Sequence, residues 1–152
     1  MPYNKIEVII LTENELMKLA VGMTERSYAP YSGFTVGAAL LCGNGRVYTG
    51  CNIENASFTP TVCAERCAIF EAVKNGERDF KMIAVAGGMH GEVKAFTYPC
   101  GVCRQVMLEF CGPDFVLLFT DGREIKKYTL AEIMPLSFTP ADLDAPKEGE
   151  KQ

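Results

Sequence analysis

Two tight-turn signals constrain the fold of this chain most strongly, because each is flanked by runs of strand-forming residues. The signals are Asn44-Gly45 and Asp121-Gly122, pairs that favour the two-residue turns of β-hairpins. The flanking strands that we expect cover residues 34–41, 46–53, 115–119 and 124–128. One antiparallel hairpin is therefore predicted in each half of the chain.

Helical patterns fill much of the chain around these hairpins. Thr12 and Glu15 have the spacing of a capping box and an apolar stripe follows them, which predicts a helix that ends before Pro30. Further helices are expected at residues 64–74, 101–110 and 130–134, with a strand at 80–86 and a loop at 87–99. Single helices that connect apolar strands imply parallel crossovers. We therefore predict an α/β fold, a three-layer α/β/α arrangement with a mixed sheet of about five strands.

The length of 152 residues suits one domain, which we place at residues 1–143. Residues 144–152 combine charge, Pro and Gly with almost nothing to bury, so we expect a flexible C-terminal tail there. The apolar run at residues 8–11 is too short for a signal peptide. No run approaches the ~20 residues of a membrane span.

Charge and cysteine content narrow the class of protein. Fifteen Lys and Arg against nineteen Asp and Glu give a net charge of -4, which disfavours nucleic acid or an anionic membrane as a partner. The chain has seven cysteines, which is an odd number, and we expect no export signal. Reduced thiols and a cytoplasmic location are therefore expected. Reduced cysteines at regular spacing are candidate metal ligands.

Three of these cysteines lie where a loop enters an expected helix. Cys63 precedes the helix at 64–74, while Cys100 and Cys103 are one helical turn apart at the start of the next helix. A helix N-terminus stabilises a thiolate, because its unpaired N–H groups and the helix dipole favour negative charge. Three thiolates can bind Zn²⁺ and leave the fourth tetrahedral position open for water, which is typical of a catalytic zinc.

Glu65 lies two residues after Cys63, so its carboxylate can approach the metal without being a ligand. A carboxylate beside a metal-bound water forms a hydrolytic pair, in which the carboxylate takes and returns a proton. Three thiolates give the zinc shell a net charge of about -1, so a nearby cation is expected to offset it. Arg66 and Arg104 both follow ligand segments, and we favour Arg66 as the donor to sulfur because it neighbours Glu65.

A closed structural zinc site is the alternative, because Cys67 lies four residues after Cys63 on the same expected helix. The protein would then be a non-catalytic module, stabilised by a structural zinc ion that binds Cys63, Cys67, Cys100 and Cys103. If the open site is correct, small buried thiols are expected at Cys42, Cys51, Cys67 and Cys111.

Four segments resemble, in the same order, sequence blocks of the cytidine deaminases, a family of zinc-dependent nucleoside deaminases. The segments are 34–39 (FTVGAA), 51–56 (CNIENA), 63–66 (CAER) and 99–105 (PCGVCRQ). The resemblance extends over roughly residues 12–143 and implies the cytidine-deaminase fold. The final hairpin agrees with it, because deaminases of nucleic acids are expected to have a parallel last pair of strands joined by a helix.

The resemblance implies hydrolytic deamination of cytidine and 2′-deoxycytidine to uridine and 2′-deoxyuridine, a reaction of pyrimidine salvage. Zinc-bound water would attack C4 of the base with Glu65 as the proton shuttle, and each subunit would hold one Zn²⁺. The implied metal ligands are Cys63, Cys100 and Cys103. The implied substrate contacts are Phe34 against the nucleoside, Asn52 and Glu54 on the ribose 3′-hydroxyl, and the backbone of Ala64 on the base.

The resemblance also implies a homotetramer whose subunits complete one another's sites. Carried over to this chain, Ala56, Phe58 and Phe138 would reach the site of an adjacent subunit. The family usually has Tyr where this chain has Phe58, so a hydrogen bond from that hydroxyl would be absent. A deaminase of the blasticidin S type is the runner-up, and the Asn-x-Glu block at residues 52–54 favours plain nucleosides over it.

Overall fold

A mixed five-stranded sheet forms the centre of the computed structural model, which describes residues 11–143. The strands are β1 (Phe34–Cys42), β2 (Val47–Cys51), β3 (Phe80–Met89), β4 (Val116–Thr120) and β5 (Ile125–Thr129). Their spatial order is β2-β1-β3-β4-β5. The tail expected at residues 144–152 lies outside the described residues, as do residues 8–10 of the apolar run at residues 8–11.

Both hairpins predicted from the turn signals are confirmed. Strand β1 pairs antiparallel with β2, and β4 pairs antiparallel with β5. Strands β3 and β4 run parallel, so the helix between them is the crossover that such a pair requires. The mixed character of the sheet follows from combining that crossover with the two hairpins.

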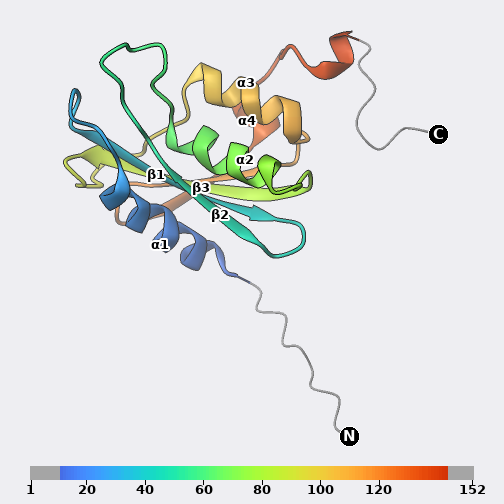
Figure 1. The fold of residues 1–152 in the computed structure, drawn as a ribbon. Coiled ribbons are helices and arrows are strands. Elements are labelled where there is room, and N and C mark those ends of the chain that lie inside the picture. Colours follow the sequence, from blue (N-terminus) through green and yellow to red (C-terminus); the bar gives the residue numbers. More distant parts are fainter. Residues whose placement is uncertain (1–10, 144–152) are drawn as a thin grey trace, which may run out of the picture.

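Helices cover both faces of the sheet (Figure 1). The helices are α1 (Glu13–Met23), α2 (Ala64–Lys74), α3 (Gly101–Phe110) and α4 (Leu130–Ile133), with short 3₁₀ turns at η1 (Thr24–Arg26) and η2 (Pro140–Leu143). Helix α1 lies on one face, and α2 and α3 lie on the other. The predicted three-layer α/β/α arrangement is confirmed, as is the capping box of Thr12 and Glu15 at the start of α1.

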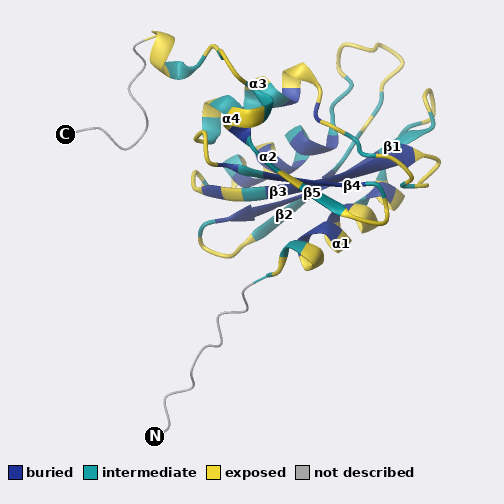
Figure 2. Cartoon of the chain, turned by 180° about the vertical axis from the view of Figure 1, so that it is seen from behind, coloured by how far each residue is buried: buried dark blue, intermediate teal, exposed yellow. Residues whose placement is uncertain are grey.

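Two clusters of buried side chains hold these layers together. Figure 2 shows that buried residues are concentrated in the strands of the sheet and in parts of the helices that cover it. On one face, Leu16 and Ala20 of α1 pack against Ala39 of β1. On the other face, Ile69 of α2 packs with Leu40, the next residue of β1. Successive strand residues point to opposite faces, so β1 serves both clusters. Each fully buried Leu or Ile contributes about 1.5–3 kcal/mol to this packing.

Two detailed expectations are wrong. Strand β3 continues to Met89, so the loop expected from residue 87 begins only after it. Gly87 and Gly88 discourage a strand by propensity, but the long partner β1 pairs with both of them and extends the ladder. The buried thiols expected outside the metal group are found for Cys42 alone, because Cys51, Cys67 and Cys111 are only half-buried.

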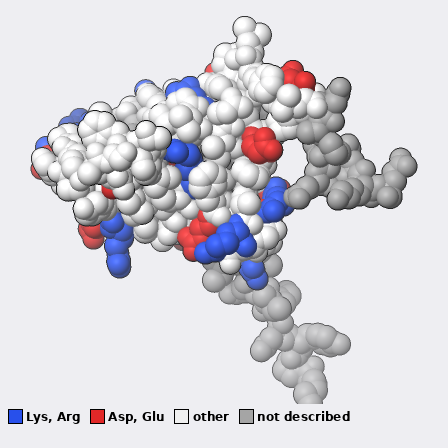
Figure 3. Space-filling view, turned by 45° about the horizontal axis from the view of Figure 1, so that its top comes forward, with Lys and Arg blue, Asp and Glu red and all other residues white. Residues whose placement is uncertain are grey.

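The surface mixes charges of both signs. Figure 3 shows Lys and Arg interspersed with Asp and Glu over the face in view, separated by wide uncharged areas. Among residues 11–143, no helix has both the length and the apolar character needed to cross a bilayer.

Candidate functional site

Three thiols meet where α2 and α3 begin. Cys63 is the N-cap of α2, Cys100 is the N-cap of α3, and Cys103 lies in the first turn of α3. The Sγ of Cys100 lies 3.7 Å from that of Cys63 and 3.6 Å from that of Cys103. All three sulfur atoms lie within 4.8 Å of one another. The structure therefore brings together the three cysteines that the sequence singled out.

The spacing of these thiols fits a tetrahedral zinc ion. Zinc–sulfur bonds of about 2.3 Å at tetrahedral angles separate two sulfur ligands by about 3.8 Å, close to the two distances above. Neither N-cap thiol makes a capping hydrogen bond, so both remain available to a metal. Cys103 is buried whereas Cys100 is exposed. The trio of Cys63, Cys100 and Cys103 is therefore covered on one side and accessible on the other.

The groups around Cys63 favour its ionised, thiolate form. Hydrogen bonds from Cys103 and then Arg66 lower the pKa of the Cys63 thiol to about 5, although burial opposes the shift. The pKa of Cys103 is raised instead, because its proton is held in the bond to Cys63 and because the thiol is buried. Cys63 is therefore the first of these two sulfurs to ionise.

The two arginines next to the trio make different contacts. Arg66 donates from Nη2 to the Sγ of Cys63 at 3.5 Å, which supports the preference for Arg66 as the donor to sulfur. Its Nε is buried and has no hydrogen-bond partner within the described residues, so it can still donate to an ionised sulfur. Arg104 donates instead to the carbonyls of Pro99 and Ile133, at 2.8 and 2.6 Å.

Glu65 lies in the first turn of α2 and is only 3% exposed. Burial raises the pKa of its carboxyl group, and the neighbouring Cys63 thiolate raises it further. A buried carboxyl beside a group of thiols is placed to exchange a proton with a small molecule bound there. The role of Glu65 in a hydrolytic pair remains a prediction, which its burial and its place beside the thiols support.

The four-cysteine alternative gains no support. Cys67 does not belong to the group of thiols that lie within 4.8 Å of one another in residues 11–143. Its Cβ instead faces β2, where a Cβ on Gly50 would lie 3.0 Å from it. The site therefore offers three sulfur ligands.

Asn52 and Glu54 lie beside this site because the backbone pairs residue 53 with residue 62. Ile53 and Val62 exchange two N–H to carbonyl hydrogen bonds of 3.0 Å each. Val62 directly precedes Cys63, so the segment with Asn52 and Glu54 is joined to the loop that carries Cys63. The local sequence pattern gave no indication that Ser27 contacts the side chain of Asn52, or that Tyr31 and Ser32 contact that of Glu54.

Phe34 begins β1 and lines a hollow of about 320 Å³ with the end of β3 and residues 92 and 94–97. A larger hollow of about 870 Å³ lies between the end of α3, α4 and residues 134–137 and 139–141, and the three thiols do not line it. Ala64 is fully buried at the first position of α2. The contact expected between its backbone and the base remains a prediction.

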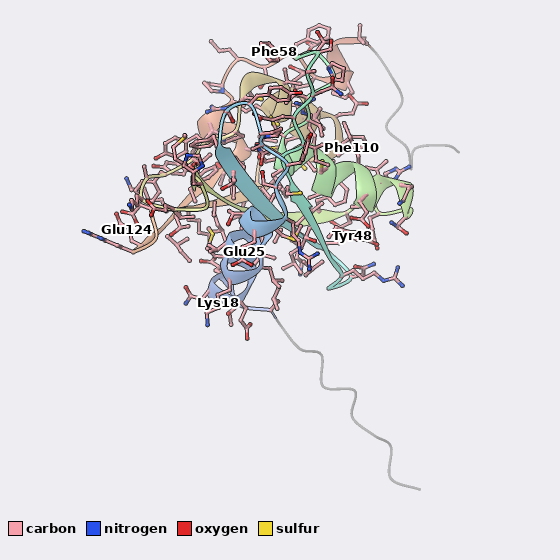
Figure 4. All side chains as sticks on the ribbon, turned by 60° about the vertical axis from the view of Figure 1, so that its left-hand side comes forward. Lys18, Glu25, Tyr48, Phe58, Phe110 and Glu124 are labelled. Carbon is pink, nitrogen blue, oxygen red and sulfur yellow. The ribbon has the colours of Figure 1, made fainter. Side chains whose placement is uncertain are left out.

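The three residues expected to act on an adjacent subunit are exposed. Phe58 lies near the tip of the loop between β2 and α2, pointing away from the sheet, with 78% of its surface exposed (Figure 4). Phe138 is 59% exposed, and Ala56 lies in the same loop as Phe58. Exposed aromatic side chains at these positions are compatible with contacts to another subunit.

Residues 11–119 match the family model described as the cytidine and deoxycytidylate deaminase zinc-binding region. The chain is 46% identical over 120 residues to the cytidine deaminase of Sporosarcina psychrophila, covering 78% of this chain and 85% of that protein. It is 45% identical over 130 residues to the cytidine deaminase of Halalkalibacterium halodurans, covering 85% and 96%. Its fold matches the crystal structure of a cytidine deaminase from Burkholderia pseudomallei with a TM-score of 0.77 at 40% identity, covering 84% of this chain and 99% of that one.

Proposed function

The chain belongs to the zinc-dependent family of cytidine and deoxycytidylate deaminases, and from this membership we propose that it deaminates free cytidine and 2′-deoxycytidine. Water replaces the 4-amino group of the base, giving uridine or 2′-deoxyuridine and ammonia, as expected for pyrimidine salvage. The observation that carries the proposal is the buried Glu65 carboxyl beside the cluster of Cys63, Cys100 and Cys103.

Zinc is the cofactor of this hydrolase family, and we propose that these three thiols hold one ion per subunit. When bound, the ion lowers the pKa of water and so supplies a nucleophile at neutral pH. The N-termini of α2 and α3 and the guanidinium of Arg66 offset the negative charge of the sulfurs. Soft sulfur ligands favour zinc over hard divalent cations.

Glu65 moves the protons of the reaction. Its carboxylate takes a proton from the attacking water and delivers it to N3 of the base as the oxygen adds to C4. The second proton of the water then passes through Glu65 to the amine, so the C4–N bond breaks and ammonia leaves. Burial suits this shuttle, because it raises the pKa of the carboxyl group and so makes its carboxylate a stronger base.

The sugar and base are held by residues around the thiols. Asn52 and Glu54 bind the ribose 3′-hydroxyl, Phe34 packs against the nucleoside, and the backbone of Ala64 contacts the base. The two backbone hydrogen bonds between Ile53 and Val62 support this assignment, because they join the segment with Asn52 and Glu54 to the loop that carries Cys63.

The enzyme assembles as a homotetramer in which Ala56, Phe58 and Phe138 contribute to a neighbouring site. The exposure of both phenylalanines supports this assembly. A cytoplasmic location is supported by the cysteines, all seven of which are free thiols.

The test is an incubation of the purified protein with cytidine, 2′-deoxycytidine and blasticidin S, together with metal analysis. Loss of the aminopyrimidine absorbance with both plain nucleosides and about one zinc per chain is the expected result. Turnover of blasticidin S without turnover of cytidine would assign the runner-up activity. A zinc-loaded protein inactive on all three compounds would contradict the proposal.

A further inference from the structure

We propose that Ser27 is a positioning residue for nucleoside recognition, whose hydroxyl holds the Asn52 side chain so that its amide N–H faces a sugar hydroxyl. The proposal rests on the function assigned above, in which Asn52 and Glu54 bind the sugar. Ser27 follows the 3₁₀ turn η1, far from Asn52 in sequence. Nothing in its local sequence marks it as part of a site.

Ser27 contacts Asn52 at two places. Its hydroxyl donates to the side-chain Oδ1 of Asn52 and lies 3.3 Å from the backbone carbonyl oxygen of the same residue. The neighbouring Tyr28 N–H donates to that carbonyl at 3.0 Å. Residues 27 and 28 therefore hydrogen-bond to both the backbone and the side chain of Asn52.

Contacts with β1 define which end of the Asn52 amide carries the oxygen. The Val36 N–H donates to Oδ1 at 2.8 Å, and Nδ2 donates to the Phe34 carbonyl at 2.8 Å. With Ser27 as the second donor, Oδ1 has both of its lone pairs filled. Asn52 is left with one N–H and so can only donate to a ligand.

Glu54 offers the complementary group, and the same segment holds it. Its Oε1 accepts from the N–H groups of Tyr31 and Ser32, at 2.9 and 3.1 Å. Hydrogen bonds from Ser32 lower the pKa of the Glu54 carboxyl group, so at neutral pH it is ionised and can only accept.

One donor and one acceptor, two residues apart in the chain, match a single hydroxyl group, which both accepts and donates. In this arrangement the sugar hydroxyl accepts from Asn52 and donates to Glu54. Contacts with β1 hold both ends of the Asn52 amide, and the Ser27 hydroxyl adds a further restraint at Oδ1. Loss of the Ser27 hydroxyl therefore loosens the donor without removing it.

The experiment compares Ser27→Ala with wild type on cytidine, 2′-deoxycytidine and 3′-deoxycytidine, the last of which lacks the hydroxyl in question. We expect KM for the first two substrates to rise about threefold to tenfold with little change in kcat, as for loss of one hydrogen bond. KM for 3′-deoxycytidine should stay at the wild-type value. Calorimetric binding of uridine and 3′-deoxyuridine should show the same contrast without turnover.

Ser27→Thr keeps the hydroxyl and should restore wild-type constants. If Ser27→Ala loses its fold or its zinc, Ser27→Cys carries the test, because it keeps the size but has a weak donor. An equal rise in KM for all three substrates, or no rise for any, overturns the role of Ser27 while leaving the deaminase intact. A wild-type enzyme that does not distinguish cytidine from 3′-deoxycytidine instead overturns the sugar contact of Asn52 and this inference with it.

Discussion

The Nη2 of Arg66 lies 3.5 Å from the Sγ of Cys63, within one turn of the same helix. Residues three apart on a helix are neighbours, so the local sequence alone brings this cation to this sulfur. The contact stabilises the thiolate of Cys63, and the Nε of Arg66 stays buried without a partner among the described residues. Arg66 thus supplies positive charge to the cluster of thiols at Cys63, Cys100 and Cys103.

Replacing Arg66 by Gln should weaken zinc binding while leaving the fold intact. Loss of a group that hydrogen-bonds a metal ligand typically lowers metal affinity about tenfold to 100-fold. Competition with a chromogenic chelator measures the zinc dissociation constant, and circular dichroism checks the fold. Arg123→Gln, in the β4–β5 turn, is the matched control and should bind zinc normally. Equal zinc affinity and equal turnover in Arg66→Gln would remove Arg66 from the mechanism.

Glu65→Gln should keep zinc and lose deamination. The amide has nearly the shape of the carboxyl group but cannot take a proton from water, so kcat should fall about 100-fold to 10,000-fold. Metal analysis and the absorbance assay on cytidine measure the two effects on the same sample. Turnover at the wild-type rate in a zinc-loaded variant would show that another group moves the proton.

Single substitutions of the four cysteines on α2 and α3 should separate an open zinc site from a closed one. Cys63→Ser, Cys100→Ser and Cys103→Ser should each lose zinc, because serine is a poor substitute for a thiolate ligand. Cys67→Ser should retain both zinc and turnover, because Cys67 faces β2 rather than the other thiols. Zinc loss in Cys67→Ser would instead favour the structural four-cysteine site.

Two glycines give opposite expectations for the same change. A Cβ on Gly50 would lie 2.3 Å from the carbonyl oxygen of Ala64, so Gly50→Ala should destabilise the protein by about 1–3 kcal/mol and disturb the start of α2. A Cβ on Gly22 in α1 would meet no side chain or neighbouring segment within 4 Å, so Gly22→Ala should stabilise by about 0.5–1 kcal/mol. Urea unfolding measures both, and zinc content should fall only in Gly50→Ala. Equal stability of the two variants would contradict this packing of α2 on β2.

Cys42 should make the protein sensitive to alkaline pH. Burial, followed by the charges of Glu77 and Asp79, raises the pKa of its thiol from 9.0 to about 11. The neutral thiol stabilises the folded state fully below pH 9.0, and this contribution is lost as pH rises towards about 11.

Urea unfolding of wild type and Cys42→Ala at several pH values tests this prediction. The variant should lose less stability than wild type between pH 9.0 and about 11, whatever its stability at neutral pH. Parallel pH dependence in the two proteins would show that Cys42 does not contribute.

Local sequence determined most of the elements of the fold. The predicted helices at 64–74 and 101–110 have the observed bounds, because each begins at a loop cysteine and ends before a break, Asn75-Gly76 or Gly112-Pro113. Both hairpins follow from their two-residue turn signals. The four sequence blocks also indicated the family, which the match over residues 11–119 confirms.

The strand order of the sheet and the contacts between distant segments depended on tertiary structure. Nothing local predicts that β3 extends through Gly87 and Gly88, since only its pairing with β1 stabilises that extension. The contact between Ser27 and Asn52 likewise joins residues that are neighbours only after η1 packs beside the end of β2.

The sequence by itself determined which side chains are chemically able to act here: thiols at helix starts, an acid two residues after one of them, and an arginine one turn along. Helix geometry fixes those relationships within a few residues. Only the tertiary structure brought Cys63 to Cys100 and Ser27 to Asn52, because such contacts depend on how helices and strands far apart in the chain pack around one core.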